Sequence, residues 1–463
     1  MDGEKFTQWN KIILITAGSI VGALIIIYLL FSAYFNNRFY FGTFINGVKV
    51  TGKTVSQVEE EFKNDDGYLL ELKCRDNNTE IISGKDIDFQ YHTDNKIQKI
   101  KDSQNSFAWI TGLFKRNDIE SELDVSYDED KLKEIYSNLS CFKDGNIVEP
   151  QNPVLNYNNG SYEITPEIKG NRIKKDVLYN LVSEALKEKK SSLDAEKLEV
   201  YENPQYTKES KELSSAKEIM DKYVSAKITY TRGNSVVAEV NGDKIKDWIL
   251  VDENYNVSLS QDKVMEFICE IDNVYDTAGV SRSFRTSEGN TISISGGDYG
   301  WVMNNAEECT VLYDLVSNGS TETREPVYLQ TGSSYDDNEI GGTYVEVNLT
   351  KQHLWFYVNG ALVTEGDVVT GNGNSAHATP PGVYKLDYKE RNATLTGPGY
   401  STKVSYWMPF NKDIGIHDAT WRKEFGGNIY MGNGSHGCVN APYNVAEAIF
   451  NNISAGNPVV CYK

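Results

Sequence analysis

The sequence predicts a multidomain protein with an N-terminal transmembrane helix, a duplicated α+β stalk and a C-terminal, mostly-β sandwich domain. Three observations lead to this fold class. They are one long uncharged apolar run near the N-terminus, two similar stretches about 130 residues apart, and closely spaced strand patterns over about the last 120 residues. The chain has 463 residues, which is too long for one ordinary domain, and 40% of them are hydrophobic, enough for several packed cores.

The apolar run covers residues 12–35 and contains no charged residue. A helix of this length crosses a hydrocarbon core of about 30 Å. A cleavable signal peptide has a shorter apolar region that ends in small residues. This run ends in Tyr34 and Phe35, so we favour an uncleaved single-pass signal anchor over a cleaved signal. Residues 1–11 then form a cytoplasmic tail, and the rest of the chain lies outside the cell membrane.

An internal repeat follows the apolar run. Residues 125–134 align with 257–266, and residues 177–182 align with 311–316, in the same order and at nearly the same offset. Each copy predicts a helix, then strands, then a second helix. The expected boundaries are 36–210 for the first α+β repeat, 211–330 for the second, 331–341 for a polar Gly/Ser linker, and 342–463 for the C-terminal domain.

Charge and cysteine content exclude several classes of protein. The chain has 46 basic and 66 acidic residues, a net charge of −20, so it lacks the basic footprint of a nucleic-acid binder. Residues 342–463 are neutral overall, and we interpret the acidity of the stalk as a solvated surface. Six cysteines without a C-x-x-C pair predict neither a disulfide scaffold nor a zinc motif.

The C-terminal domain predicts many strands and one helix. Alternation and a turn at Asn359-Gly360 indicate a hairpin, and Thr379-Pro-Pro-Gly382 turns into another strand. The expected strands are 345–349, 354–358, 361–369, 383–386 and 459–462, and the expected helix is 443–452. These elements predict a β-sandwich.

Two short segments of this domain carry reactive residue types. Cys438 lies in the polar run Gly434–Asn440, where a buried filler cysteine such as Cys461 would not lie. A thiol is nucleophilic, and an imidazole that takes its proton makes it more so. His417 and His436 are the candidate imidazoles. Zinc binding by these three residues is disfavoured, because their spacing is not that of a zinc site. The other histidines are interpreted as surface or core residues: His92, His353 and His377.

These segments resemble the L,D-transpeptidase (YkuD-type) catalytic domain. In that family a histidine precedes Ser/Thr-His-Gly-Cys-apolar-Asn by about 14–17 residues. Here 17 residues separate His417 from Ser435, and residues 435–440 fit the motif at every position. The resemblance covers about 120 residues. The duplicated stalk more weakly resembles the peptidoglycan-binding repeats that precede this domain in some Gram-positive members.

The resemblance implies an acyltransferase that needs no metal or other cofactor. Cys438 would attack the third residue of a tetrapeptide stem and expel D-Ala, with His417 as base. Backbone groups at His436, Gly437 and Cys438 would hold the oxyanion. An amine of a second stem would then give a 3→3 peptidoglycan cross-link, and carbapenems would acylate Cys438. The side chain of Asp418 has no assigned role. The expected substrate-binding residues are Ser435, Asn440, Tyr406, Trp407 and Trp421, of which the three aromatic residues could equally belong to the core.

Three alternatives remain at this stage. An L,D-carboxypeptidase or amino-acid exchanger would use the same residues with another acceptor. A protein-anchoring transpeptidase would use a protein amine as acceptor. A wall-binding module with a silent site is disfavoured, because both His417 and Cys438 are present. The expected partners are peptidoglycan stem peptides and the membrane, and no nucleic acid.

Overall fold

Two compact units make up the chain in this computed structural model. The residues that the structure describes are 3–63, 67–373, 376–397 and 399–463. The first unit comprises Met1–Val154 with Pro166–Thr207, and the second comprises Leu155–Thr165 with Lys208–Lys463. The short segment Leu155–Thr165 therefore belongs to the second unit, although the chain on both sides of it belongs to the first.

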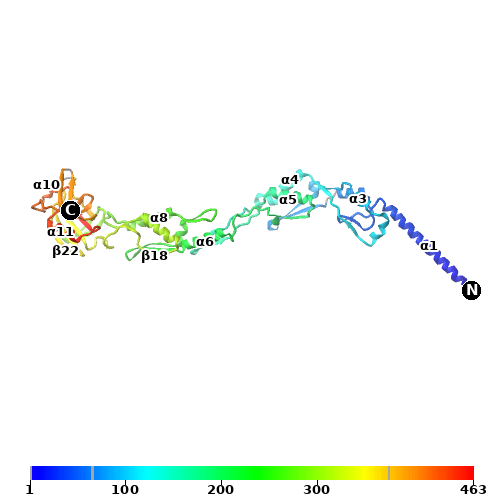
Figure 1. Ribbon diagram of the computed structural model, residues 1–463, viewed down its shortest axis with the longest axis horizontal. Helices are drawn as coiled ribbons and strands as arrows, with labels where there is room; N and C mark the ends of the chain where they lie inside the picture. Colours follow the sequence, from blue (N-terminus) through cyan, green and yellow to red (C-terminus); the bar gives the residue numbers. More distant parts are fainter. Residues whose placement is uncertain (1–2, 64–66, 374–375, 398) are drawn as a thin grey trace. The chain divides into compact units, whose positions relative to one another are not determined.

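The N-terminal helix α1 (Gly3–Tyr34) projects from the rest of the first unit, and its apolar length is exposed (Figure 1). Within it, Thr7–Tyr34 is long and apolar enough to cross a membrane. The hydroxyls of Thr16 and Ser19 donate to carbonyls four residues earlier, so neither is an unpaired polar group. The predicted helix is confirmed and fits the membrane anchor.

Next to α1 the first unit holds a small mixed domain with a three-stranded sheet in the order β2-β1-β6. Its core contains Phe39, Ile45, Val50, Val58 and Ile97, which close the sheet against the helices. The bounds are β1 Thr43–Ile45, β2 Val48–Lys49, α2 Val55–Lys63, β5 Gln90–His92, α3 Lys96–Asp102, the 3-10 helix η3 Ser106–Leu113, β6 Asn117–Ile119 and β7 Asp124–Ser126.

The duplication predicted from the sequence is visible in the two units. Each copy contains an antiparallel hairpin to which a third strand is added in parallel. In the first copy this strand is β10, which follows α5 and pairs with β3. In the second copy it is β18, which follows α9 and pairs with β11. The first copy contains β3 Leu69–Lys73, β4 Thr79–Ser83, α4 Glu129–Ser137, α5 Lys175–Lys187 and β10 Ser192–Asp194. The second contains α6 Lys211–Val224, β11 Lys227–Arg232, β12 Ser235–Val240, α7 Gly242–Ile245, β13 Ile249–Val251, β14 Val257–Leu259, α8 Gln261–Tyr275, β17 Val302–Met303, α9 Asn305–Ser317, β18 Thr321–Arg324 and β19 Tyr328–Gln330.

Local sequence explains why both copies form these helices. Asp128 and Ser260 occupy the same place before α4 and α8, and each accepts hydrogen bonds from backbone N–H groups of the first helical turn. In α5 the buried residues Leu178, Val182 and Ala185 recur at helical spacing and form one apolar face. The two copies thus cap the first of their aligned helices in the same way.

Each repeat also contributes a β-hairpin, which follows α4 in the first copy and α8 in the second. The hairpin β8 (Val154–Asn158) and β9 (Ser161–Thr165) packs in the second unit, where Tyr162 is buried against α6. The predicted boundaries, 36–210, include this hairpin in the first repeat. The corresponding hairpin β15 (Arg282–Arg285) and β16 (Thr291–Ile294) buries Phe284 and Ile294 against the C-terminal domain.

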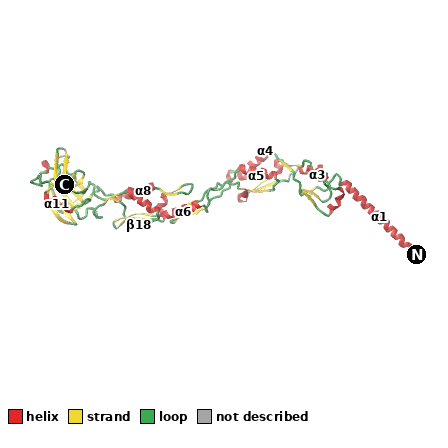
Figure 2. Cartoon of the chain, in the orientation of Figure 1, coloured by secondary structure: helices red, strands yellow, loops and turns green. Residues whose placement is uncertain are grey.

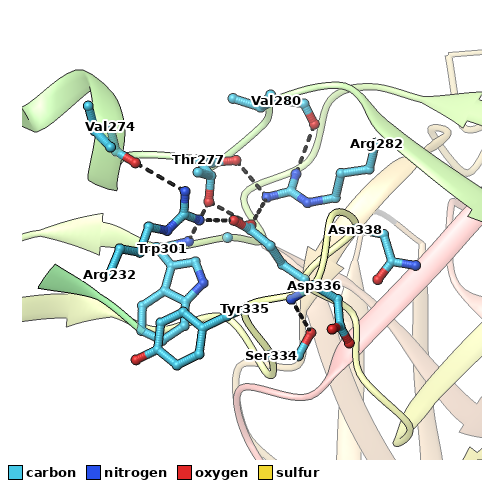
Figure 3. A network of polar contacts seen from close by, with 12 residues as sticks. Arg232, Val274, Thr277, Val280, Arg282, Trp301, Ser334, Tyr335, Asp336 and Asn338 are labelled. Carbon is cyan, nitrogen blue, oxygen red and sulfur yellow. Dashed lines mark hydrogen bonds and ion pairs between the residues drawn. The ribbon is translucent and has the colours of Figure 1, made fainter. Parts of the chain in front are cut away.

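The predicted linker, residues 331–341, is buried only at Glu339 and Ile340, and Figure 3 shows the network of polar contacts there. The carboxylate of Glu339, 5% exposed, accepts hydrogen bonds from Arg232, Arg282 and Thr277. Ile340 is buried with residues of the C-terminal domain. The polar composition is typical of a linker. The buried Glu339 carboxylate is nevertheless paired with Arg232 and Arg282, which hold it in place.

The C-terminal domain contains the two expected layers of strands (Figure 2). One sheet has the order β22-β21-β20-β28-β23 and the other has the order β24-β25-β26-β27. Alternate side chains of both sheets and one face of α11 enclose the core. The bounds are β20 Tyr344–Asn348, β21 His353–Val358, β22 Ala361–Asp367, β23 Gly382–Lys385, β24 Glu390–Gly397, β25 Tyr400–Asn411, β26 Ile414–Asp418, α10 Tyr430–Asn433, β27 Val439–Ala441, α11 Tyr443–Asn452 and β28 Pro458–Tyr462.

Candidate active site

Two neighbouring parallel strands, β26 and β27, position the candidate residues. Their register pairs Ile416 with Val439 and His417 with Asn440. Ile416 and Val439 are fully buried in the core, so His417 and Asn440 point to the other face of the sheet. Cys438 directly precedes β27, which brings it beside the beginning of β26.

The His417 ring is held in one orientation. Its Nδ1 lies 2.9 Å from the carbonyl oxygen of Asp418, and the ring stacks on Trp421 with centroids 5.8 Å apart. A carbonyl can only accept, so Nδ1 carries the proton and Nε2 carries the lone pair. His417 is therefore in the tautomer that can act as a base through Nε2.

Asn440 contacts the His417 ring, and Arg422 contacts Asn440. The hydrogen-bonding pattern assigns the Asn440 amide nitrogen toward His417 Nε2, at 3.0 Å. The Asn440 oxygen then accepts from Arg422 Nε at 2.8 Å and Nη2 at 3.2 Å, while Arg422 Nη1 donates to the carbonyl of Asn433. The guanidinium thus fixes the amide, and the amide fixes the imidazole.

The turn before β27 is shaped by Ser435 and Gly437. The Ser435 hydroxyl donates to the Cys438 carbonyl and accepts the Gly437 N–H at 3.0 Å. Gly437 has φ +125°, and a Cβ there would lie 2.9 Å from the Ile414 side chain. Thr379 Oγ1 donates to the Gly437 carbonyl at 2.6 Å and so fixes the turn from its other side.

A cavity of about 380 Å³ opens over these residues. It is large enough for part of a peptide chain, and it joins the thiol, the imidazole and the guanidinium in one space. Its lining residues are Leu395, Thr402, His417, Trp421, Arg422, Gly434, Ser435, His436, Cys438 and Asn440.

Comparison with known proteins identifies this domain. A family model described as "L,D-transpeptidase catalytic domain" matches residues 342–461, and one described as "Putative peptidoglycan binding domain" matches residues 82–194 and 206–324. A crystal structure of an Enterococcus faecium L,D-transpeptidase, a cysteine-to-serine mutant, is 30% identical. The match covers 54% of this chain and 100% of that one, with a TM-score of 0.44.

The chain belongs to the L,D-transpeptidase family. An NMR structure of the catalytic domain of the E. faecium enzyme is 40% identical over 26% of this chain and 96% of that domain, with a TM-score of 0.24. The assignment depends on sequence identity and on the family models. No curated protein matches the chain.

In this L,D-transpeptidase the thiol and the imidazole are both uncharged at neutral pH. Burial raises the pKa of the Cys438 thiol to about 11. Burial, with a further contribution from the charge of Arg422, lowers the pKa of His417. The thiol lies 3.5 Å from the carbonyl oxygen of Asp413. The resting site therefore holds an uncharged imidazole and a protonated thiol, rather than an ion pair.

The structure brings most of the expected site residues together. The cavity is lined by His417, Ser435, His436, Cys438, Asn440 and Trp421, and Gly437 lies in the adjoining turn. Ser435 and Asn440 bond to the backbone and to His417, so both hold the site as well as line it.

Tyr406 and Trp407 take other positions. Tyr406 is 2% exposed in the core and donates to Glu447 at 2.7 Å, so it does not reach the cavity. Trp407 on β25 pairs with His417 on β26, and the centroids of the two rings lie 5.9 Å apart. The Asp418 carboxylate, which had no assigned role, accepts backbone N–H groups of Ser405 and Tyr406.

Sequence reasoning missed two contacts of the site. Arg422 follows Trp421 directly, and its position five residues after His417 was a signal that could have been used. The ring centroids of His377 and His436 lie 4.7 Å apart. The sequence had indicated only a surface or core position for His377. That pairing depends on folding, because the two residues are far apart in the sequence.

Proposed function

We propose that this enzyme forms 3→3 peptidoglycan cross-links through a thioester on Cys438. The observation that supports this most directly is that Cys438 and His417 open into one cavity from neighbouring strands. A neutral imidazole beside a protonated thiol suits a mechanism in which the proton moves as the thiol attacks.

In the proposed acylation the Cys438 thiol turns from Asp413 toward His417 Nε2, which gives up its hydrogen bond from the Asn440 amide. The sulfur attacks the carbonyl of the third residue of the donor stem while Nε2 takes the thiol proton. The C–N bond to D-Ala then breaks, and the imidazolium returns the proton to the departing amine. The backbone N–H of Cys438 stabilises the oxyanion, because the Gly437 N–H already donates to Ser435 Oγ.

In the second half the side-chain amine of another stem attacks the thioester. His417 takes a proton from the amine and the new amide forms. The C–S bond then breaks, and the imidazolium returns this proton to the departing sulfur to restore the thiol. Exchange of one amide for another needs no external energy source, which suits an enzyme outside the cell. The catalytic domain of the E. faecium enzyme has been determined acylated by ertapenem, which supports Cys438 as the acylated residue and this enzyme as a carbapenem target.

We propose that α1 anchors the enzyme as a single-pass segment, with the cytoplasmic tail inside and both units outside. The two repeats then lie between α1 and the catalytic domain in the order of the chain. Their match to a peptidoglycan-binding model supports a position within the wall of a Gram-positive cell.

Mass spectrometry of a defined disaccharide-tetrapeptide tests this function. The full chain in detergent should produce a dimer that is lighter than two substrates by one D-Ala, and Cys438→Ala should produce none. Tripeptide with free D-Ala and no dimer would instead identify an L,D-carboxypeptidase. Retention of the substrate without turnover would identify a binding module.

Replacing Arg422 should weaken catalysis through His417. In Arg422→Lys the bidentate contact to Asn440 is lost but the charge stays, so kcat should fall about tenfold or more with little change in KM. In Arg422→Gln the charge is lost as well, the pKa of His417 rises, and the acid limb of the pH–rate profile should move to higher pH.

Lys423→Gln is the matched control for Arg422→Gln, because it removes the same charge from the exposed next residue. Its pH–rate profile should be that of the unmodified enzyme. An equal shift in both variants would mean that Arg422 acts only through long-range charge and not through Asn440.

A further inference from the structure

The 3-10 helix η3 (Ser106–Leu113) lies against the C-terminal turns of α1. The Tyr28 hydroxyl donates to the Phe107 carbonyl at 2.5 Å, and Trp109 Nε1 donates to the Tyr28 carbonyl at 3.2 Å. The Trp109 ring, 6% exposed, lies 4.8 Å from the Phe31 ring. These contacts fix η3 beside the helix.

A close backbone approach holds η3 from its other side. A Cβ at Gly112 would lie 1.6 Å from the Phe41 carbonyl oxygen, and a Cβ at Gly42 would lie 2.5 Å from the Gly112 carbonyl oxygen. Only glycine fits this approach at either position. The position of η3 relative to α1 is therefore set by packing and not by a loose loop.

A second face of η3, beginning at Phe107 beside the Tyr28 ring, is apolar and exposed. In a 3-10 helix residues three apart align on one face, and Phe107, Ile110 and Leu113 are 54%, 44% and 54% exposed. Phe114 at the end of the helix is 87% exposed. No charged residue occurs from 103 to 114, whereas Lys115 and Arg116 follow at once. Exposed apolar side chains gathered in this way mark an interaction surface.

The place of η3 along α1 indicates what this surface contacts. The apolar run 12–35 would measure about 36 Å as a helix, which exceeds a hydrocarbon core of about 30 Å. Its last residues must therefore emerge at the outer membrane boundary. Because η3 packs between Tyr28 and Phe35, it lies at this boundary, where aromatic residues and basic side chains are favoured.

We propose that residues 106–116 form a second membrane contact, in which Phe107, Ile110, Leu113 and Phe114 enter the outer bilayer interface. Lys115 and Arg116 then lie at the level of the lipid phosphates. This inference depends on the proposed anchoring by α1. With two contacts the first unit has a fixed orientation at the membrane, whereas with the helix alone the unit could rotate about the helix axis.

Lipid quenching of a fluorescent amino acid tests this contact. The full chain is reconstituted in vesicles of equal phosphatidylglycerol and phosphatidylcholine, with the probe placed singly at position 20, 81 or 114. Ile20 lies in α1, and Ile81 is an apolar residue of the first unit that is 60% exposed on β4. Brominated lipids should quench the probe at 20 and at 114, and leave the probe at 81 unchanged.

Bromine near the headgroup should quench position 114 more than bromine near the chain end, and the reverse should hold at position 20. Quenching at 20 without quenching at 114 would overturn the second contact and leave the anchor intact. Absence of quenching at 20 would overturn the anchor itself. A blue-shifted but unquenched probe at 114 would mean that another protein surface covers η3, which also contradicts the proposal.

Discussion

The His417→Gln variant is expected to lose about 10²–10⁴-fold in the rate of acylation by a tetrapeptide donor. Glutamine can keep a hydrogen bond to the Asp418 carbonyl, but it cannot take the Cys438 proton. The remaining reaction must use thiolate that forms on its own. Because burial raises the Cys438 pKa to about 11, that thiolate is scarce at neutral pH.

The pH dependence separates this explanation from simple loss of structure. In the unmodified enzyme the rate should rise through the lowered pKa of His417 and then stay level in the neutral range. In His417→Gln the rate should instead rise about tenfold per pH unit until the thiol ionises. Stopped-flow acylation measured from pH 5 to about pH 10 would show the two profiles.

His353→Gln is the matched control for this prediction. His353 lies on β21, bonds to Asp367 at 2.7 Å, and does not line the cavity. This variant should keep both the rate and the level profile. If His417→Gln also kept a level profile, another group would be the base.

The sequence was sufficient to predict that Cys438 and His417 lie at one site, because their motif is local. Ser435 to Asn440 are consecutive, and His417 lies one strand away, so a single strand pairing completes the pair. The same reasoning could not place Tyr406 and Trp407. Adjacent residues of a strand point to opposite faces, so at most one of them could face the site. The burial of Tyr406 in the core shows that Tyr406 does not face the site.

The junction between the second repeat and the catalytic domain was harder to predict. The segment 331–341 is polar and rich in small residues, which is typical of a free linker. Its main contacts are to Arg232 and Arg282, far back in the chain, and nothing in the local pattern shows them. The hairpin β15–β16 likewise finds its apolar partners only in the folded unit.

Replacing Glu339 by alanine is expected to destabilise the second unit by about 3–5 kcal/mol, because Arg282 is 3% exposed and would lose its counterion. For a unit of this size the unfolding temperature should fall by at least about 6 °C. Differential scanning calorimetry of the full chain in detergent would measure the transition. Hydrogen exchange would show whether protection is lost first in residues 331–341 and in the hairpin β15–β16.

Asp337→Ala provides the control, since Asp337 is exposed in the same segment and carries the same charge. Its unfolding temperature should stay within the range of ordinary surface substitutions, about 0.5 kcal/mol in either direction. Glu339→Gln separates charge from shape. It keeps the size of the side chain but leaves two guanidinium groups facing a neutral amide, so it should be nearly as unstable as Glu339→Ala. If Glu339→Gln were instead as stable as the unmodified enzyme, hydrogen bonding alone would hold the junction, and the buried charge pair would contribute little.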